Sequence, residues 1–355
     1  MSSPSNPSKP PLPRKRWRGA WLIGLAVSVA LLAWVLYRID PAKVWADARQ
    51  SNGWLLLLTV TFATLTFPVR ALRWRLILRD AQGRPLPLLP LWHATTIGFM
   101  ANNLLPARAG EVARGYVASR RLPVRFTTAL ASIAVERLFD ALVMLGLMAV
   151  AIAAPSFPVQ THFGGRSLSA IAASTAALFG LVLVIALVVA NRPGPWLVLV
   201  ERTSRRFLPV RIADRIVRAS DGIVEGLAVL KSPGRFVGVV AWSLVLWLKN
   251  AAAFAICFRA FGIGIPLEAA LVLQSVVGFG VAIPSTAGYI GVFEAATVFT
   301  LQQYGVDANL ALAYALTYHL TTFIPITLLG LWSLSRLHLH IEDLSAASAS
   351  GEATA

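Results

Sequence analysis

The chain has a single cysteine, Cys257, among its 355 residues, so it can form neither an intramolecular disulfide nor a cysteine-based metal site. It is also poor in charge. Asp, Glu, Lys and Arg make up 14% of the sequence, whereas about a quarter is usual for a soluble domain. The hydrophobic fraction is 57% and the mean hydropathy is +0.67. Long runs almost free of charge are typical of membrane-spanning helices, and the sequence therefore predicts an integral membrane protein.

Acidic residues are scarce beside basic ones, with 16 Asp and Glu against 32 Lys and Arg and a net charge of +16. Basic residues collect on the cytoplasmic side of membrane proteins, and attraction to anionic lipid is a compatible second effect. We therefore expect membrane lipids as partners, with an anionic or glycosylated head group, and no nucleic acid. Residues 1–18 and 336–355 are predicted to be disordered tails in the cytoplasm, which places the protein in the inner (cytoplasmic) membrane.

Six apolar segments are predicted as full transmembrane helices: 19–37, 53–69, 126–154, 167–190, 236–262 and 309–334. The basic stretch 191–235 is predicted to be a cytoplasmic loop. Within it, apolar residues from Ile212 to Leu230 recur at helical spacing, which predicts an amphipathic helix on the membrane surface. A cleaved signal peptide is the alternative for the first segment, but its length and its Trp residues near both ends favour a retained helix.

The segment 88–105, "LLPLWHATTIGFMANNLL", is apolar but has arginines on both flanks, between Arg70 and Arg84 and again between Arg108 and Arg125. If both flanks stay in the cytoplasm, the segment must enter and leave the membrane from that face. This arrangement predicts a re-entrant hairpin, with an ordinary short helix and a surface loop as the alternative. The same charge rule predicts that residues 267–305 form a second hairpin that enters from outside.

The two predicted hairpins share a short pattern, P-x-x-A-G followed by an acidic residue. In the first it spans Pro106 to Gly110 and in the second Pro284 to Gly288, and these four residues are the predicted hairpin turns. The pattern suggests repeat units of about 53–154 and 236–334, in opposite orientations. Such units are typical of secondary transporters, although short matches between Ala-rich segments also arise by chance. The predicted fold is an all-α polytopic bundle with inverted repeats and eight or nine apolar segments.

Three charged residues interrupt the third predicted span. Glu136, Arg137 and Asp140 lie 11 to 15 residues past Arg125, which is about 16–22 Å along a helix and near the middle of a bilayer. Each such charge costs at least ~2.5 kcal/mol there, and such residues usually have partners and face a bundle interior or water. Two interpretations stay open: an Arg137–Asp140 pair that only locks helices together, and a transport site.

Other polar residues also fall within or beside the apolar segments, and we include them in the candidate binding and transport site. Arg108 and Arg114, near the mouth of the first hairpin, would suit a lipid phosphate or would simply anchor the chain at the membrane surface. The complete candidate set is Asn103, Arg108, Glu111, Arg114, Glu136, Arg137, Asp140, Lys249, Glu294 and His319.

At these residues the chain resembles the lysylphosphatidylglycerol synthase transmembrane-region family, also called flippase-like membrane proteins. The matching motifs are "GFMANNLLPARAGEVARGYVASRR", "ALASIAVERLFDAL", "AIPSTAGYIGVFEAA" and "ALAYALTYHLTTFIPITLLGL", within residues 60–335. The resemblance implies a membrane protein that moves or helps process lipids with charged or glycosylated heads. It also implies roles for Asn103, Pro106, Gly110, Glu111, Arg114, Glu136, Arg137, Asp140, Pro284, Gly288 and Glu294. Ala287 and His319 depart from the family pattern, which often has Pro and Arg there, and this leaves the head group open.

Together these features favour a transporter or flippase for a phospholipid, glycolipid or hopanoid-type lipid, with no catalytic residue, cofactor or metal. The sequence has no G-x-x-x-x-G-K-[ST] loop for ATP, so a lipid gradient, the membrane potential or protons would drive movement. A membrane-embedded transferase is the first alternative, with Glu111, Glu136 and Asp140 holding Mg²⁺ and a pyrophosphate, although common enzyme motifs such as D-x-D and H-E-x-x-H are absent. The second is an accessory subunit of a lipid or envelope biosynthesis system. A homo-oligomer or a lipid-synthesis enzyme as partner fits these readings.

Overall fold

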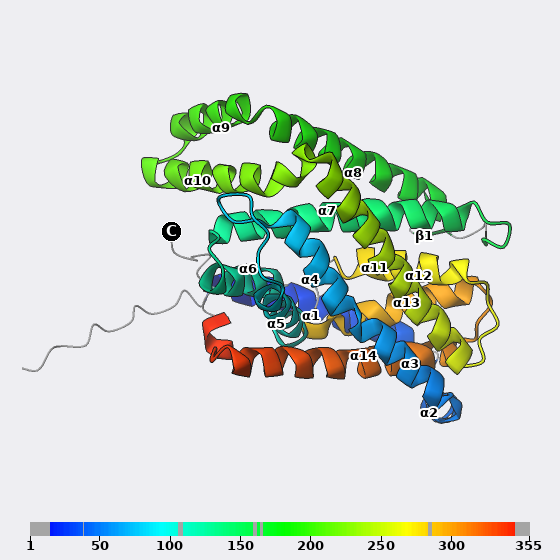
Figure 1. The fold of residues 1–355 in the computed structure, drawn as a ribbon. Helices are drawn as coiled ribbons and strands as arrows, with labels where there is room; N and C mark the ends of the chain where they lie inside the picture. Colours follow the sequence, from blue (N-terminus) through cyan, green and yellow to red (C-terminus); the bar gives the residue numbers. More distant parts are fainter. Residues whose placement is uncertain are drawn as a thin grey trace, which may run out of the picture.

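The computed structural model describes residues 15–37, 39–105, 109–158, 162–163, 166–282 and 286–344, and it is almost entirely helical (Figure 1). A two-residue antiparallel pairing joins β1 to β2. In chain order the elements are α1 (Lys15–Leu36), α2 (Pro41–Gln50), α3 (Gly53–Thr64), α4 (Thr66–Ile77), α5 (Leu88–Leu104), α6 (Ala109–Arg121), α7 (Phe126–Ile152), β1 (His162–Phe163), β2 (Arg166–Ser167), α8 (Leu168–Asn191), α9 (Pro193–Phe207), α10 (Val210–Gly226), η1 (Leu227–Lys231), α11 (Pro233–Ala260), α12 (Glu268–Gly280), η2 (Ala287–Tyr289), α13 (Val292–Gln303) and α14 (Ala308–Arg336).

Within the described residues, three helical stretches are long and apolar enough to cross a membrane: α3 with α4, α11 and α14. Two bent pairs raise the number to five if each is one span. Residues 25–36 pair with α2 at an angle of 86°, and residues 180–191 pair with α9 at 100°. All six segments predicted as spans are helices, and α7 has 27 residues with its three charges near the middle. The number of six full spans stays a prediction.

The second predicted span is longer than expected. The segment 53–69 continues through α4 to Ile77, so Arg70 and Arg73 lie inside the bundle, where both are buried. By charge alone they count with the basic flank that extends to Arg84, because the positive-inside rule counts charges. The structure buries them beside Glu136 on α7, which compensates their charge.

The predicted terminal tails also differ from the structure. Helix α1 begins at Lys15, inside the predicted tail 1–18. At the other end the chain stays ordered beyond residue 336, since Leu344 is completely buried in the main hydrophobic core. Apolar residues at the end of the chain are therefore part of the fold. Residues 1–14 and 345–355 lie outside the described residues.

Two helical hairpins, α5 with α6 and α12 with α13, begin at opposite ends of α7 (Figure 1). Helix α6 ends at Arg121, which donates a hydrogen bond to the Leu337 carbonyl just past α14, and α7 begins a few residues later. Beyond the other end of α7, the Ser156 hydroxyl donates to Glu268 at the start of α12. Because a 27-residue helix is about 40 Å long, the hairpins approach each other from opposite ends of the bundle.

The two hairpins meet near the middle of the bundle. Gly288, in η2, has φ +70°, and a Cβ there would lie 3.5 Å from the Asn103 carbonyl oxygen and 2.8 Å from the Phe323 ring. The Asn103 side chain donates to the Thr327 hydroxyl of α14 at 2.9 Å. The end of α5, the tip of the second hairpin and α14 therefore contact one another. The predicted turn residues Pro106 and Pro284, and the site residue Arg108, lie outside the described residues.

Glycines close the first hairpin. A Cβ at Gly110 would lie 1.9 Å from the Gly98 carbonyl oxygen, and one at Gly98 would lie 2.8 Å from the Gly110 carbonyl. The Gly110 N–H donates to the Asn102 side chain at 2.9 Å. Only glycine allows two backbones to approach so closely, so the pattern of Gly98, Asn102 and Gly110 sets the separation of α5 and α6.

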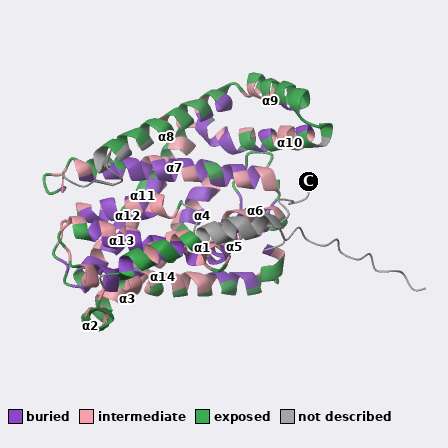
Figure 2. Cartoon of the chain, turned by 180° about the vertical axis from the view of Figure 1, so that it is seen from behind, coloured by how far each residue is buried: buried purple, intermediate pink, exposed green. Residues whose placement is uncertain are grey.

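The burial pattern fits a bundle whose periphery is apolar (Figure 2). Buried residues concentrate where α5, α7 and α12 pack, whereas α8 and α9 are exposed over much of their length. The predicted amphipathic helix is present as α10. It packs on α7, with Gly222 against Thr127 and Gly226 against Ala131. Its contact with a membrane surface stays a prediction.

Candidate functional site

The centre of the site is formed by α4 and α7. Glu136 and Asp140 lie one turn apart on α7 and face Arg73 on α4. Arg73 Nη2 is 3.1 Å from Glu136 Oε1 and Arg73 Nη1 is 2.5 Å from Asp140 Oδ1. Arg73 Nη1 also donates to the Ser243 hydroxyl of α11 at 2.9 Å. A single, fully buried guanidinium thus links two carboxylates to a third helix.

The first hairpin joins this centre through Arg114 on α6. Its two terminal nitrogens donate to the two oxygens of Glu136, both at 2.9 Å, and its guanidinium carbon lies 3.8 Å from the centroid of the Trp74 ring. Bidentate, charge-assisted bonds of this type are among the strongest in proteins, and a face-on cation–π contact adds to them. Arg114 therefore holds the hairpin against α7 and α4.

Arg137 and Asp140 extend the network toward its edge. Arg137 lies 3.4 Å from Asp140 and 3.2 Å from Glu136, and its Nε is 3.6 Å from Glu111 on α6. The Trp247 indole N–H of α11 donates to Asp140 at 2.9 Å. The Arg137–Asp140 pair predicted from the sequence is present, but it is one contact in a network that connects α4, α6, α7 and α11.

Arg70 is held differently from the other arginines. Its Nη1 is 3.6 Å from both Glu136 and Asp140, which is beyond hydrogen-bond distance. Its guanidinium carbon lies 4.9 Å from the Phe99 ring centroid and 5.7 Å from that of Trp247. In the described part of the chain, no acceptor takes a hydrogen bond from its buried Nε or Nη1. Arg70 thus packs near two aromatic rings and has donors unused.

Stability alone does not account for a buried network of this size. Well-packed apolar residues often replace a buried ion pair with no loss of stability, or with a gain of about 1–4 kcal/mol. Charged side chains within a membrane are expensive and commonly mark substrate or ion pathways. We call the seven residues of this network the ion network and treat it as the candidate site: Arg70, Arg73, Glu111, Arg114, Glu136, Arg137 and Asp140.

Glu294 and His319 form a separate pair on α13 and α14. His319 Nδ1 is 2.6 Å from Glu294 Oε1, while the Gly291 N–H donates to Glu294 Oε2 at 2.6 Å. Glu294 therefore both caps the start of α13, as carboxylates at a helix N-terminus commonly do, and joins it to α14. The His319 ring packs against Phe293 and Phe323, which places this pair near the tip of the second hairpin.

Lys249 contacts the helix break between α3 and α4. Its ammonium group donates to the Phe62 carbonyl and to the Thr66 hydroxyl. The last carbonyls of a helix lack partners within the helix, so this lysine satisfies a group that the break leaves free. It is still close enough to Arg70 for electrostatic repulsion. The structure thus gives Lys249 a structural partner next to the ion network.

Sequence reasoning assembled only part of this site. It selected Glu111, Arg114, Glu136, Arg137 and Asp140, and the structure brings these five residues together. It omitted Arg70 and Arg73, although their i, i+3 spacing directly after an apolar run was a usable signal. Ser243 and Trp247 carry no comparable signal in the sequence, since their role depends on how α11 packs.

The carboxylates of the ion network face guanidinium groups. In the ranges that the structure describes, no three His, Cys, Asp or Glu side chains are grouped so that they could hold a metal ion. Both oxygens of Glu136 accept hydrogen bonds from Arg114, and Asp140 and Glu111 each lie against an arginine. A Mg²⁺ site built from these three carboxylates would therefore first require several ion pairs to break.

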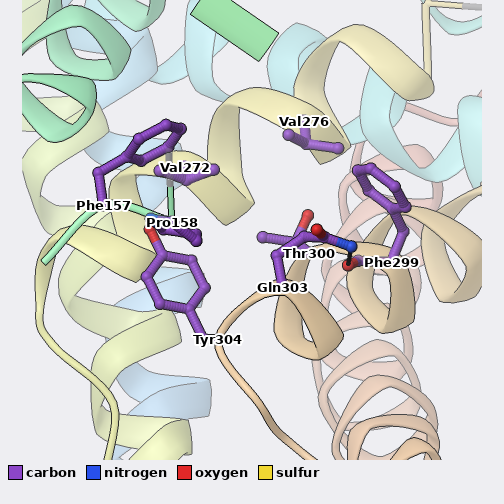
Figure 3. Close-up of a pocket in the computed structure, with 8 residues that line it drawn as sticks. All are labelled: Phe157, Pro158, Val272, Val276, Phe299, Thr300, Gln303 and Tyr304. Atoms are coloured by element: carbon purple, nitrogen blue, oxygen red, sulfur yellow. Dashed lines mark hydrogen bonds between the residues drawn. The ribbon is translucent and has the colours of Figure 1, made fainter. Parts of the chain in front are cut away.

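A shallow crevice lies between the end of α7 and the second hairpin (Figure 3). The Gln303 side chain donates to the Phe299 carbonyl beside it at 3.4 Å. The lining of the crevice has no charged side chain. It consists of Phe157, Pro158, Val272, Val276, Phe299, Thr300, Gln303 and Tyr304. The crevice is thus chemically unlike the ion network, and we do not include it in the candidate site.

An apolar helical bundle with several membrane-length helices and charges at its centre defines a multi-pass membrane protein. The chain belongs to the family described as "Lysylphosphatidylglycerol synthase TM region", whose match covers residues 21–330. This confirms the resemblance seen in the sequence motifs.

Two curated relatives show how far the similarity extends. One is "Glycosyltransferase AglD" of Haloferax volcanii, 27% identical over 338 residues, which cover 86% of this chain and 53% of that protein. The other is a "UPF0104 membrane protein" of Methanothermobacter thermautotrophicus, 25% identical over 331 residues, which cover 86% of this chain and 91% of the relative. The chain thus spans about half the length of the first relative and nearly all of the second.

Proposed function

We propose that the protein moves a polar-headed lipid between the two leaflets of the cytoplasmic membrane, with both termini in the cytoplasm. The observation that carries this proposal is the ion network, which lies against a hairpin whose inner end contacts the tip of a second, opposed hairpin. A lipid head group that crosses about 30 Å of hydrocarbon needs polar partners on the way. The ion network supplies such partners, and the two hairpins act as the gate.

Arg114 couples the gate to the polar residues. It lies on α6, one turn past Gly110, and holds Glu136 on α7 with two hydrogen bonds. A shift of α6 along α7 moves the α6 side of the ion network, which carries Arg114, while the Asn103 contacts with α14 and the second hairpin open. Family membership and the relative named as a membrane protein support a role within the membrane.

We predict that the two hairpins open to opposite sides of the membrane. The test uses Arg120→Cys and Gln302→Cys, two exposed positions at the open ends of the two hairpins, in a chain in which the buried Cys257 is replaced by Ala. A membrane-impermeant maleimide added to sealed inverted vesicles should label Arg120→Cys, and in intact cells it should label Gln302→Cys. Labelling of both positions from the same side would contradict the opposed arrangement.

Transport itself is tested in liposomes with the purified protein and fluorescent phospholipid or glycolipid, by quenching the outer leaflet. A short thiol-specific crosslinker in the pair Asn103→Cys and Thr327→Cys, whose native side chains are 2.9 Å apart, should reduce lipid movement to the protein-free rate. A reducing agent that cleaves the linker should restore movement. The crosslink holds the gate shut because it ties α5 to α14.

The matched control is the pair Asp40→Cys and Asn309→Cys, which joins the start of α2 to α14, away from the hairpin ends. Crosslinking there should leave lipid movement unchanged. If the wild-type protein moves none of the fluorescent lipids, the proposed function fails. Equal inhibition in both pairs would show that the crosslink acts on the bundle in general and would remove the gate from the proposal.

The second candidate is a membrane-embedded transferase that acts on a lipid-linked substrate. It is favoured by the relative named as a glycosyltransferase, of which this chain spans 53%. The two functions predict different products, because a transferase changes the mass of a lipid and a transporter only changes its leaflet. Mass spectrometry of the lipids extracted after the liposome assay therefore separates them.

A further inference from the structure

The ion network has more positive than negative groups. Its four guanidinium groups face three carboxylates, and Lys249 lies near enough to add to the positive potential at Arg70. An uncompensated charge buried in a protein interior costs several kcal/mol, and the cost in a bilayer is of similar size. The surplus therefore calls for an anion that the described chain does not supply.

Arg70 and Arg137 hold their carboxylates least closely, with shortest distances of 3.6 Å and 3.2 Å. Arg73 and Arg114 each hold a carboxylate at 3.1 Å or less. Arg70 has a side chain that is only 7% exposed, yet its Nε and Nη1 find no hydrogen-bond acceptor among the described residues. The Nε atoms of Arg137, Arg73 and Arg114 also find no acceptor there. Arg70 Nη1 lies 3.6 Å from Glu136 and Asp140, and Arg137 Nε lies 3.6 Å from Glu111, which is beyond hydrogen-bond distance.

The site is open on one side. Arg137 and Glu111 are each about a third exposed, at 33% and 32% of their side chains, whereas Arg73, Arg114 and Glu136 are buried. The Phe99 and Trp247 rings lie near the Arg70 guanidinium. Arg137 and Glu111 thus form the accessible edge of the ion network, and Arg70 lies in its buried part.

We propose that Arg70 and Arg137 form a binding site for one phosphate group. The guanidinium fork matches phosphate oxygens in a bidentate manner, and a phosphodiester with one negative charge would neutralise the four arginines together with the three carboxylates. The existence of the phosphate site does not depend on the proposed transport function. Its assignment to the head group of a transported lipid rests on the proposed function. Arg114, which the sequence suggested for this role, is already engaged with Glu136.

The test measures binding to the full-length protein in a neutral maltoside detergent, by quenching of tryptophan fluorescence and by thermal shift. The probes are dihexanoyl phosphatidylglycerol, inorganic phosphate and dihexanoylglycerol, which has the same tails without phosphate. The phosphatidylglycerol should bind saturably and the dihexanoylglycerol should not. Arg70→Gln and Arg137→Gln should each weaken the dissociation constant by ~10-fold or more, which equals about 1.4 kcal/mol and fits the loss of one charge-assisted hydrogen bond.

Arg84→Gln is the control, because this arginine is 72% exposed and pairs with Asp80 outside the bundle. Its affinity should stay within about twofold of the wild type, since a surface pair contributes little. Because Arg137 is partly exposed, its variant tests the site even if Arg70→Gln does not fold. Equal affinity of wild type and both site variants would overturn the proposal, and so would equal binding of the phosphate-free lipid.

The two phosphate probes distinguish the source of the group. Binding of phosphatidylglycerol supports a lipid head group, while binding of inorganic phosphate alone keeps the phosphate site but removes its link to lipid movement. A protein that binds phosphatidylglycerol but moves no lipid in liposomes retains this site and loses the proposed function. If Arg70→Gln and Arg137→Gln leave lipid movement unchanged and the protein binds neither phosphate probe, the proposed function is retained and the phosphate site is lost.

Discussion

Glu136→Gln is expected to lower the free energy of unfolding by about 3–5 kcal/mol, the cost of removing one partner from a buried ion pair. Glu136 is completely buried, accepts two hydrogen bonds from Arg114 and lies 3.1 Å from Arg73. An uncharged amide of the same size keeps the volume but leaves two guanidinium groups under-neutralised. The expected readouts are a lower thermal unfolding midpoint and a smaller folded fraction after detergent extraction.

A double-mutant cycle with Arg114→Gln separates the contact from general damage. If the two residues act as a pair, the double variant should be more stable than the sum of the single losses predicts, with a coupling of about 1–3 kcal/mol. Glu201→Gln is the control, because Glu201 pairs with Arg205 at the surface and such a pair contributes less than about 1 kcal/mol. A Glu136→Gln protein as stable as the wild type would show that the network does not hold α6, α7 and α4 together.

Gly110→Ala is expected to destabilise the first hairpin by about 3 kcal/mol, toward the upper end of the usual cost of overpacking. The new Cβ would lie 1.9 Å from the Gly98 carbonyl oxygen and 2.5 Å from the Asn102 side chain. Because the closest obstacle is backbone, α5 and α6 must separate, and the hydrogen bond from the Gly110 N–H to Asn102 is lost with them. The separation also displaces Arg114, one turn later, from Glu136.

Gly146→Ala on α7 is the matched control. No other atom lies within 4 Å of a Cβ at this position, and alanine has a higher helix propensity than glycine by about 0.8–1.0 kcal/mol. This variant should therefore be as stable as the wild type or slightly more stable. The comparison uses thermal unfolding in the same detergent. If Gly110→Ala behaves like Gly146→Ala, the close contact between α5 and α6 is not a constraint on the fold.

The sequence predicts part of the interior of the bundle, namely the groups of residues that lie close together in the chain. Glu136, Arg137 and Asp140 share one face of a single helix, and helical spacing shows this without a structure. Gly98, Asn102 and Gly110 lie close in the chain on either side of one turn, so the first hairpin was predictable. The opposed orientation of the hairpins followed from charge counting, and their membrane placement and the inverted repeat stay predictions.

Charge counting does not reveal a partner that lies far away in the chain. Arg70 and Arg73 looked like cytoplasmic anchors because they begin a run of arginines, but their carboxylate partners are on α7, 67 residues later in the case of Arg73 and Asp140. Lys249 and His319 looked alike as isolated polar residues in apolar segments. The structure separates them, since Lys249 contacts a helix break and His319 contacts Glu294.

The sequence by itself determined that this is a helical membrane protein with charges in its middle, because composition and helical periodicity depend only on neighbouring residues. Only the tertiary structure decided which charges meet. The packing of α4, α6 and α11 around α7 brings together residues as far apart as Arg73 and Ser243, 170 positions from each other. It also leaves Arg70 with unused donors while Arg114 is paired. Pairing of buried charges depends on distances between helices, and a one-dimensional pattern does not contain those distances.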